Sequence, residues 1–162
     1  MSVAFTNKEN QALRVYAKTL LNPKSAKSSN ICYPIFLHDK LLLAYAVKKG
    51  VTMALFKEIK NNSPFDDQEW SVFLNINLRT LQRYKKNSNH IFKPIQSEKV
   101  FELAEVVHKG CEVFDSPEDF TLWLRSPSAA LCNEVPINLL DTSYGKDLVL
   151  SELNNIEYGL FV

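Results

Sequence analysis

Helix start and stop signals recur from Asp39 to the C-terminus, and they leave little room for any fold other than a bundle of helices. The clearest start is Ser116-Pro117-Glu118-Asp119, which combines a capping hydroxyl, a proline at the first helical position and acids in the first turn. Gly50 follows an apolar segment as a C-cap, and Thr52 is placed to cap the next helix. These signals predict an all-α fold.

The expected helices follow from apolar residues spaced three and four apart between those signals. They cover residues 7–21, 41–49, 52–61, 66–74, 78–86 and 97–114, with further helices opening at Pro117 and at Asp141 or Thr142. The apolar residues available for burial in the last helix are Leu148, Leu150, Leu153 and Ile156. The stretch Ile31–Leu37 is broken by Pro34, so we expect a packed loop or an edge strand there.

Charge divides the chain near residue 96. Residues 1–96 hold 15 Lys and Arg against 6 Asp and Glu, a net +9, whereas residues 97–162 hold 4 against 12, a net −8. The basic part suggests a polyanionic partner and the acidic part a basic one, although two ordinary solvated surfaces would give the same counts. We therefore expect one domain over residues 39–96 and another over residues 97–162. A polar loop at 22–30 would set an N-terminal arm, residues 1–38, apart from them.

Composition argues against a membrane protein, a metalloprotein or an enzyme. Apolar runs stay below the roughly 18 residues of a membrane helix, and the N-terminus lacks the apolar core of a signal peptide. Three well-separated cysteines fit a reducing cytosol better than a disulfide framework or a zinc site. The three histidines are isolated, and phosphate-binding, dinucleotide and nucleophile-elbow motifs are missing. We expect a cytoplasmic protein with no cofactor, no metal and no catalytic residue.

Two short helices joined by the turn Asn75-Ile76-Asn77 form a helix-turn-helix pattern. The residues expected to hold the two helices together are Trp70, Phe73, Leu74, Leu78, Leu81 and Tyr84. The second helix then turns five candidate DNA contacts outward: Arg79, Thr80, Gln82, Arg83 and Lys86. Arg and Gln can pair with base edges, while Thr and Lys suit phosphates, and Lys85 and Lys93 add attraction to the backbone. A solvated basic helix within a bundle is the alternative.

The last forty residues carry a fixed order of small motifs. They are Trp123-Leu124, Pro127, Ala130-Leu131, Pro136, Leu139-Leu140-Asp141-Thr142, Gly145 and Ile156-Glu157-Tyr158-Gly159. This order resembles the toxin-binding domain of the Xre/MbcA/ParS antitoxins. The segment Asn77–Arg83 is similar to the start of the recognition helix in the same family, and the resemblance extends over residues 40–162. Where the family has glycines after Ala-Leu, this chain has Cys132 and Asn133, of which Asn133 can still adopt a left-handed turn.

The resemblance implies a type II antitoxin. Such a chain binds a RES-domain toxin that consumes NAD, inhibits it sterically with its C-terminal tail, and represses its own operon as a DNA-bound homodimer, within a larger toxin–antitoxin hetero-oligomer. The tail residues that would contact the toxin are Glu157, Tyr158, Gly159, Leu160, Phe161 and Val162. The tail could instead pack on its own domain. The rival functions are a stand-alone helix-turn-helix transcription regulator without a toxin, and a helical adaptor that binds only protein.

Overall fold

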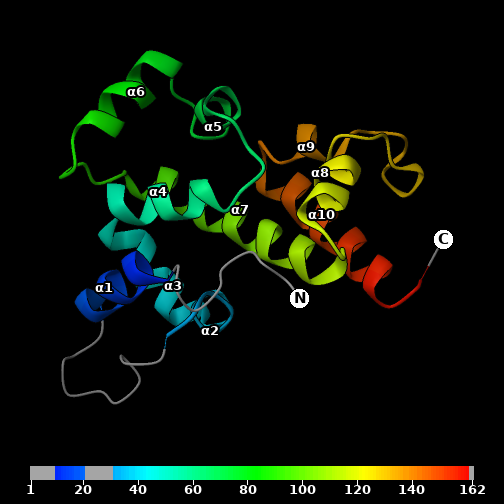
Figure 1. Cartoon of the computed structure of the whole chain (residues 1–162), viewed down its shortest axis with the longest axis horizontal. Helices are drawn as coiled ribbons and strands as arrows, with labels where there is room; N and C mark the ends of the chain where they lie inside the picture. The colour runs from blue at the N-terminus through cyan, green and yellow to red at the C-terminus, as the bar shows by residue number, and fades with distance from the viewer. Residues whose placement is uncertain (1–9, 21–30, 161–162) are drawn as a thin grey trace. The chain divides into compact units, whose positions relative to one another are not determined.

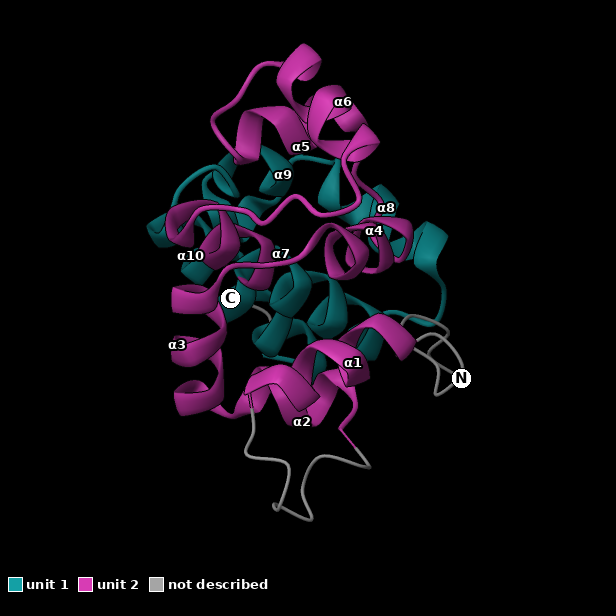
Figure 2. Cartoon of the chain, turned by 90° about the vertical axis from the view of Figure 1, so that its left-hand side faces the viewer, with its two compact units in different colours: residues 1–4, 102–162 teal, residues 5–101 magenta. Residues whose placement is uncertain are grey.

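Helices make up nearly all the regular structure of the chain (Figure 1). The computed structural model describes residues 10–20 and 31–160; pairing of β type among them is limited to two isolated bridges, Thr52 with Ile91 and Ser128 with Glu134. The expected all-α fold is confirmed. The described residues divide into two compact units, an N-terminal unit that ends at Phe101 and a C-terminal unit that begins at Glu102 (Figure 2).

The N-terminal unit contains six helices and the beginning of a seventh among its described residues. They are α1 (Gln11–Leu20), α2 (Tyr33–His38), α3 (Lys40–Lys49), α4 (Met53–Asn61), α5 (Asp67–Phe73), α6 (Leu78–Lys86) and the first turns of α7 (Pro94–Val113). Three of them start at caps placed by the sequence, because Thr52, Asp66 and Asn77 each accept a hydrogen bond from a backbone N–H three residues on. Gly50, with φ of 89°, ends α3 as expected.

Two helix starts differ from the prediction for one physical reason. Residues 33–38 form α2 and not a loop or edge strand, with Pro34 in the first turn of the helix. Helix α7 begins at Pro94, three residues before the expected Ser97. Proline fits the first turn of a helix because its fixed φ is helical and its missing N–H has no intrahelical partner there. Both prolines therefore open helices.

Helix α1, within the segment expected to form an N-terminal arm, contributes to the core of the N-terminal unit. Leu13, Tyr16 and Ala17 of α1 are fully or almost fully buried. The Tyr16 hydroxyl donates to the carbonyls of Ala46 and Gly50, both at 2.9 Å, and so ties α1 to the end of α3. This packing was not predicted, because the polar segments on both sides of α1 suggested that it lies apart from the domain.

An aromatic cluster fills the N-terminal unit around Trp70, which is fully buried in α5. Its ring lies 5.1 Å from Phe56 of α4 in an edge-to-face arrangement and 5.8 Å from Phe65. The indole N–H donates to the Ser63 hydroxyl at 3.3 Å. Leu55, Phe56 and Ile59 of α4 are fully buried.

The C-terminal unit surrounds the second half of α7. It contains α8 (Pro117–Leu124), the 3₁₀ turn η2 (Ala129–Leu131), α9 (Pro136–Leu139) and α10 (Ser143–Glu157). Ser116 caps α8 and Thr142 caps α10, as the sequence predicts. Trp123 is half-buried, and its ring centroid lies 5.7 Å from that of Phe114 and 6.3 Å from that of Phe120. None of the helices among residues 10–20 and 31–160 is long and apolar enough to cross a membrane.

Burial along α10 departs from the prediction. Val149 is fully buried with Leu153, whereas Leu148 is 56% exposed and Leu150 and Ile156 are half-buried. The close approach of α9 at Gly145 sets the buried face, because a Cβ there would lie 1.9 Å from the Leu139 carbonyl oxygen. Lys109 and Lys146 reinforce the packing of α10 on α7 through ion pairs with Glu157 and Glu105.

Candidate interaction surfaces

The helix-turn-helix of the N-terminal unit is built from hydrogen bonds that the sequence encodes locally. Asp66 and Glu69 form a reciprocal capping box at the start of α5, with N···O distances of 2.8 and 2.9 Å. At the end of α5, Asn75 adopts a left-handed φ of 51°, and Ile76 donates to the Ser71 carbonyl. Asn77 then caps α6 by accepting from the Thr80 N–H at 2.8 Å. The expected three-residue turn is confirmed.

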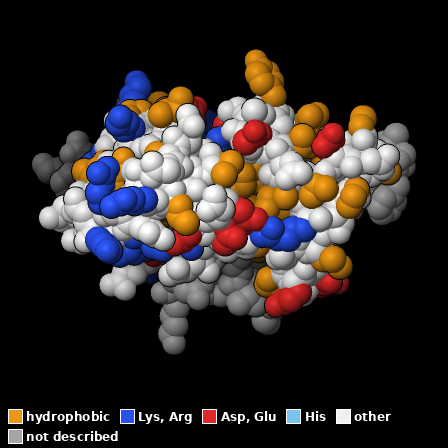
Figure 3. Space-filling model, turned by 90° about the horizontal axis from the view of Figure 1, so that it is seen from above, with side chains coloured by type: hydrophobic (Ala, Val, Ile, Leu, Met, Phe, Trp, Pro, Cys, Tyr) orange, Lys and Arg blue, Asp and Glu red, His pale blue; other side chains and the backbone are white. Residues whose placement is uncertain are grey.

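Helix α6 presents its basic side to solvent. Leu81 is fully buried against α5, while Leu78 and Tyr84 are half-buried. Of the five candidate DNA contacts, Arg79, Gln82, Arg83 and Lys86 are exposed and Thr80 is half-buried. All five, with Asn77, line one surface hollow of about 400 Å³. Figure 3 shows Lys and Arg side chains gathered on this part of the N-terminal unit.

Asp67 links α6 to two other helices. Its carboxylate accepts a hydrogen bond from Lys85 of α6 at 2.7 Å and lies 2.9 Å from the ammonium of Lys60 in α4. The hydrogen bond from Lys85 and the ammonium of Lys60 lower the pKa of this carboxyl from its ordinary value. Lys85 was expected to attract a DNA backbone, but in this structure it holds α6 on α5.

Arg83 lies at the end of a stack that also contains Tyr84 and His90. Its guanidinium lies 5.7 Å from the centre of the Tyr84 ring, and that ring stacks on His90 with centroids 3.7 Å apart. Burial, reinforced by the positive charge of Arg83, lowers the pKa of His90 and favours a neutral imidazole in the stack. The stack restricts where Arg83 can point. His90 is isolated in the sequence, so no local pattern predicted this role.

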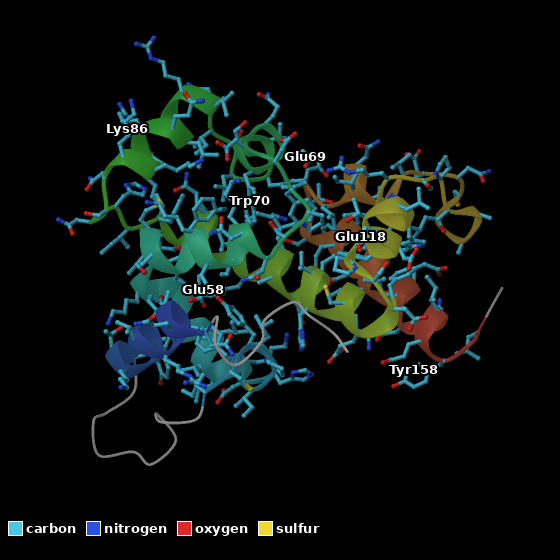
Figure 4. The ribbon with its side chains drawn as sticks, in the orientation of Figure 1. Glu58, Glu69, Trp70, Lys86, Glu118 and Tyr158 are labelled. Atoms are coloured by element: carbon cyan, nitrogen blue, oxygen red, sulfur yellow. The ribbon has the colours of Figure 1, made fainter. Side chains whose placement is uncertain are left out.

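The tail leaves the C-terminal unit through a glycine turn. Gly159 has φ of 65°, its N–H donates to the Ile156 carbonyl, and the Leu160 N–H donates to the Asn155 carbonyl at 2.8 Å. These two hydrogen bonds form a Schellman motif, which ends α10 and redirects the chain. Tyr158 is 72% exposed and Leu160 59% exposed, so more than half of each residue faces solvent. Figure 4 shows Tyr158 at the end of α10. Phe161 and Val162 lie outside the described residues.

Glu157 differs from its neighbours in the tail because it has an internal partner. Its carboxylate accepts a hydrogen bond from the Lys109 ammonium of α7 at 2.6 Å. The pair holds the end of α10 to α7 and offsets the negative charge expected to face a toxin. Glu157 is therefore an exposed residue whose charge is paired within its own unit.

The loop after η2 has two residues in the left-handed region. Cys132 has φ of 57° and ψ of 35°, and Asn133 has φ of 64°. Asn133 therefore makes the left-handed turn predicted for it, and Cys132 adopts the same conformation despite its side chain. This chain thus forms a left-handed turn there without glycine.

Glu58 is a structural residue that sequence reasoning missed. Its carboxylate accepts hydrogen bonds from the Ala12 N–H at 2.7 Å and the Tyr33 hydroxyl at 2.7 Å. It therefore caps α1 from α4, 46 residues away in sequence, and also anchors α2. Figure 4 shows Glu58 between these helices. A local motif could not have revealed a cap supplied over such a separation.

Two family models match the chain. Residues 42–105 match the antitoxin Xre-like helix-turn-helix domain, and residues 110–159 match the antitoxin Xre/MbcA/ParS C-terminal toxin-binding domain. A curated relative, the Prs ADP-ribosylating antitoxin of Sphingobium sp. (strain YBL2), is 32% identical over 124 residues, which cover 71% of this chain and 77% of the relative.

A solved structure has the same fold over most of its length. The crystal structure of the M. tuberculosis MbcT-MbcA toxin-antitoxin complex contains a chain that matches with a TM-score of 0.55 and 18% identity. The match covers 68% of this chain and 96% of that chain. At this level of identity the likeness concerns the fold alone.

An Xre-like helix-turn-helix domain followed by a toxin-binding domain defines an antitoxin of a toxin–antitoxin system. The first matched range contains α5 and α6, and the second contains all of α10 and ends at Gly159. The chain belongs to the Xre/MbcA/ParS family of antitoxins.

Proposed function

We propose that this antitoxin inhibits a RES-type, NAD-consuming toxin by placing its C-terminal tail, residues 158–162, at the entrance of the toxin's active site. The observation that carries the proposal is the exit of the tail at Gly159, where two large apolar side chains, Tyr158 and Leu160, stay exposed. Large apolar side chains at the surface favour a protein contact, and aromatic residues often dominate such interfaces. The chain of similar fold in the MbcT-MbcA structure also comes from a toxin-antitoxin complex.

Inhibition of this kind is steric. The tail would occupy space that NAD needs, so the antitoxin contributes no catalytic residue and no cofactor. Glu157 contributes less charge than its position suggests, because Lys109 is paired with it. We therefore assign it to bracing the end of α10 and the toxin contact to Tyr158 and the residues beyond.

Co-expression in cells tests this role. The product of the neighbouring gene, where we expect the RES-type toxin, is produced alone, with the full antitoxin, and with an antitoxin ending at Glu157. We expect growth arrest and NAD loss with the toxin alone, protection by the full chain and no protection by the truncated chain. Equal protection by both chains would overturn the role of the tail. If expression of the neighbouring gene alone causes neither growth arrest nor NAD loss, the result would instead favour a transcription regulator without a toxin.

We also propose that α6 binds operator DNA through Arg79, Thr80, Gln82, Arg83 and Lys86. These side chains share one hollow, and α6 carries four basic residues and no acid. The five contacts of a single helix are few for tight binding, so specific binding calls for a homodimer that reads two half-sites.

Binding to the DNA upstream of the operon, measured over a range of salt concentrations, tests the second proposal. We expect Arg79→Ala with Arg83→Ala to weaken binding at least tenfold and to reduce the slope of log affinity against log salt by about 2. Lys57→Ala is the control, because this exposed lysine of α4 lies outside the hollow. Unchanged affinity and slope in the double variant would leave the N-terminal unit with a protein-binding role.

A further inference from the structure

Helix α10 carries a second apolar feature besides the tail. Tyr144 is 87% exposed and Leu148 is 56% exposed. Together with Ser151, Asn155 and Tyr158, they follow one another at alternating intervals of four and three residues, so they form a single line along the helix. We call these five residues the α10 stripe. It lies away from the buried face formed by Gly145, Val149 and Leu153.

We propose that the α10 stripe is a second toxin-binding surface, which lies in an apolar groove of the toxin and guides the tail to the active site. This inference rests on the proposed toxin-binding function. The first argument is continuity, because Tyr158 is both the last residue of the stripe and the first residue of the exposed tail. The match to the toxin-binding domain covers the whole stripe and ends one residue beyond it, at Gly159.

The dimensions of the stripe fit the binding of a helix in a groove. From Tyr144 to Tyr158 the helix rises about 21 Å. Apolar residues at intervals of three and four are the usual anchors of this mode of recognition. The centre of the stripe is small and polar, with Ser151 and Asn155, so the two ends supply the anchors. A partner groove would then have two apolar depressions separated by a narrower middle.

Charge indicates a basic partner. The stripe residues carry no charge, and acidic residues lie on its two sides, Asp147 and Glu152. Asp147 is 69% exposed at its side chain and pairs with Lys146 at 2.8 Å, so the negative charge comes mainly from residues 97–162 as a whole, which have a net charge of −8. Two copies of this antitoxin joined stripe to stripe would bring two surfaces of the same net sign together, which opposes self-association. A toxin groove with basic residues at its rim would instead complement both the apolar line and its acidic sides.

Binding of the full-length antitoxin to the purified RES-domain protein encoded beside it tests the proposal. Tyr144→Ser combined with Leu148→Ser removes the first two anchors, and Ser151→Arg places a bulky side chain at the centre of the stripe. Leu122→Ser is the control, since Leu122 is 67% exposed on α8 of the same unit but outside the stripe. We expect the stripe variants to weaken binding at least tenfold and the control to stay within twofold.

The outcomes separate the two proposals. If the unchanged antitoxin does not bind the toxin at all, the proposed function fails and this inference fails with it. If the antitoxin binds and the stripe variants bind equally well, the stripe is not a toxin contact although the function stands. A stripe variant that binds the toxin normally but sediments as a smaller assembly would assign the stripe to a second copy and overturn the proposal. Circular dichroism of each variant verifies that it is folded.

Discussion

Cys132 adopts a backbone conformation that costs energy for any residue with a Cβ. At φ of 57° a non-glycine residue is less stable by about 1–2 kcal/mol, and glycine removes this cost while losing some entropy on folding. Cys132→Gly should therefore raise the free energy of unfolding by about 0.5–1 kcal/mol. Urea denaturation measures the change. Ala130→Gly, two residues earlier at a position without positive φ, should lower stability instead. If both variants lowered the free energy of unfolding by the same amount, the backbone at Cys132 would not be strained.

Asp67 should contribute to stability in a pH-dependent way. Its pKa is lowered in the folded chain by Lys85 and Lys60. The contribution is therefore full above the ordinary carboxyl pKa of about 4 and is lost as the pH falls through the lowered value. Asp67→Asn should reduce the free energy of unfolding by up to about 1 kcal/mol at pH 7, in line with a partly exposed ion pair. The difference from the unchanged chain should shrink as the pH falls below about 4, and a difference that is constant with pH would contradict this account.

At the scale of the element, the close approach of α9 and α10 depends on Gly145. A Cβ there would meet the Leu139 carbonyl oxygen at 1.9 Å, and backbone on both sides would have to move. We expect Gly145→Ala to lower the free energy of unfolding by about 2 kcal/mol or more, despite the better helix propensity of alanine. Thermal and urea unfolding measure this. Ser151→Ala, at an exposed position of the same helix, should change stability by less than about 0.5 kcal/mol. A neutral Gly145→Ala would contradict the packing described.

Elements with local signals were predictable, and elements set by distant contacts were not. Caps at Thr52, Ser116 and Thr142 located three helices because each cap acts within its own first turn. Helix α2 was missed because Pro34 was interpreted as a strand breaker. The prediction of the buried face of α10 was wrong, because apolar residues occur on two sides of this helix. The packing of α9 at Gly145 decides which side is buried.

The candidate surfaces were predictable to different degrees. Periodicity placed the basic side chains of α6 on one exposed face, because Leu81 and Tyr84 fix the opposite face. It could not show that Lys85 is engaged by Asp67, since that partner comes from another helix. In the tail, the sequence suggested apolar anchors but not the ion pair between Glu157 and Lys109, which joins residues 48 positions apart. Sequence alone does not identify the partner of a side chain when that partner is far away in the chain, as for Lys85 and Glu157.

At the scale of the whole molecule, the sequence separates two kinds of partner by charge. The basic residues 1–96 include the helix-turn-helix, and the acidic residues 97–162 include the tail and the α10 stripe. Since the two surfaces belong to different compact units, changes in one should leave the other intact. An antitoxin with Arg79→Ala and Arg83→Ala should therefore still inhibit its toxin while no longer binding operator DNA.

NAD consumption by the purified RES-domain protein, with an equimolar amount of antitoxin, tests the central claim most directly. Three antitoxins are compared: the full chain, the chain ending at Glu157, and the full chain with Arg79→Ala and Arg83→Ala. The account predicts that the first and third stop NAD consumption and that the truncated chain leaves it unchanged. Inhibition by the truncated chain as strong as by the full chain would show that residues 158–162 do not block the toxin.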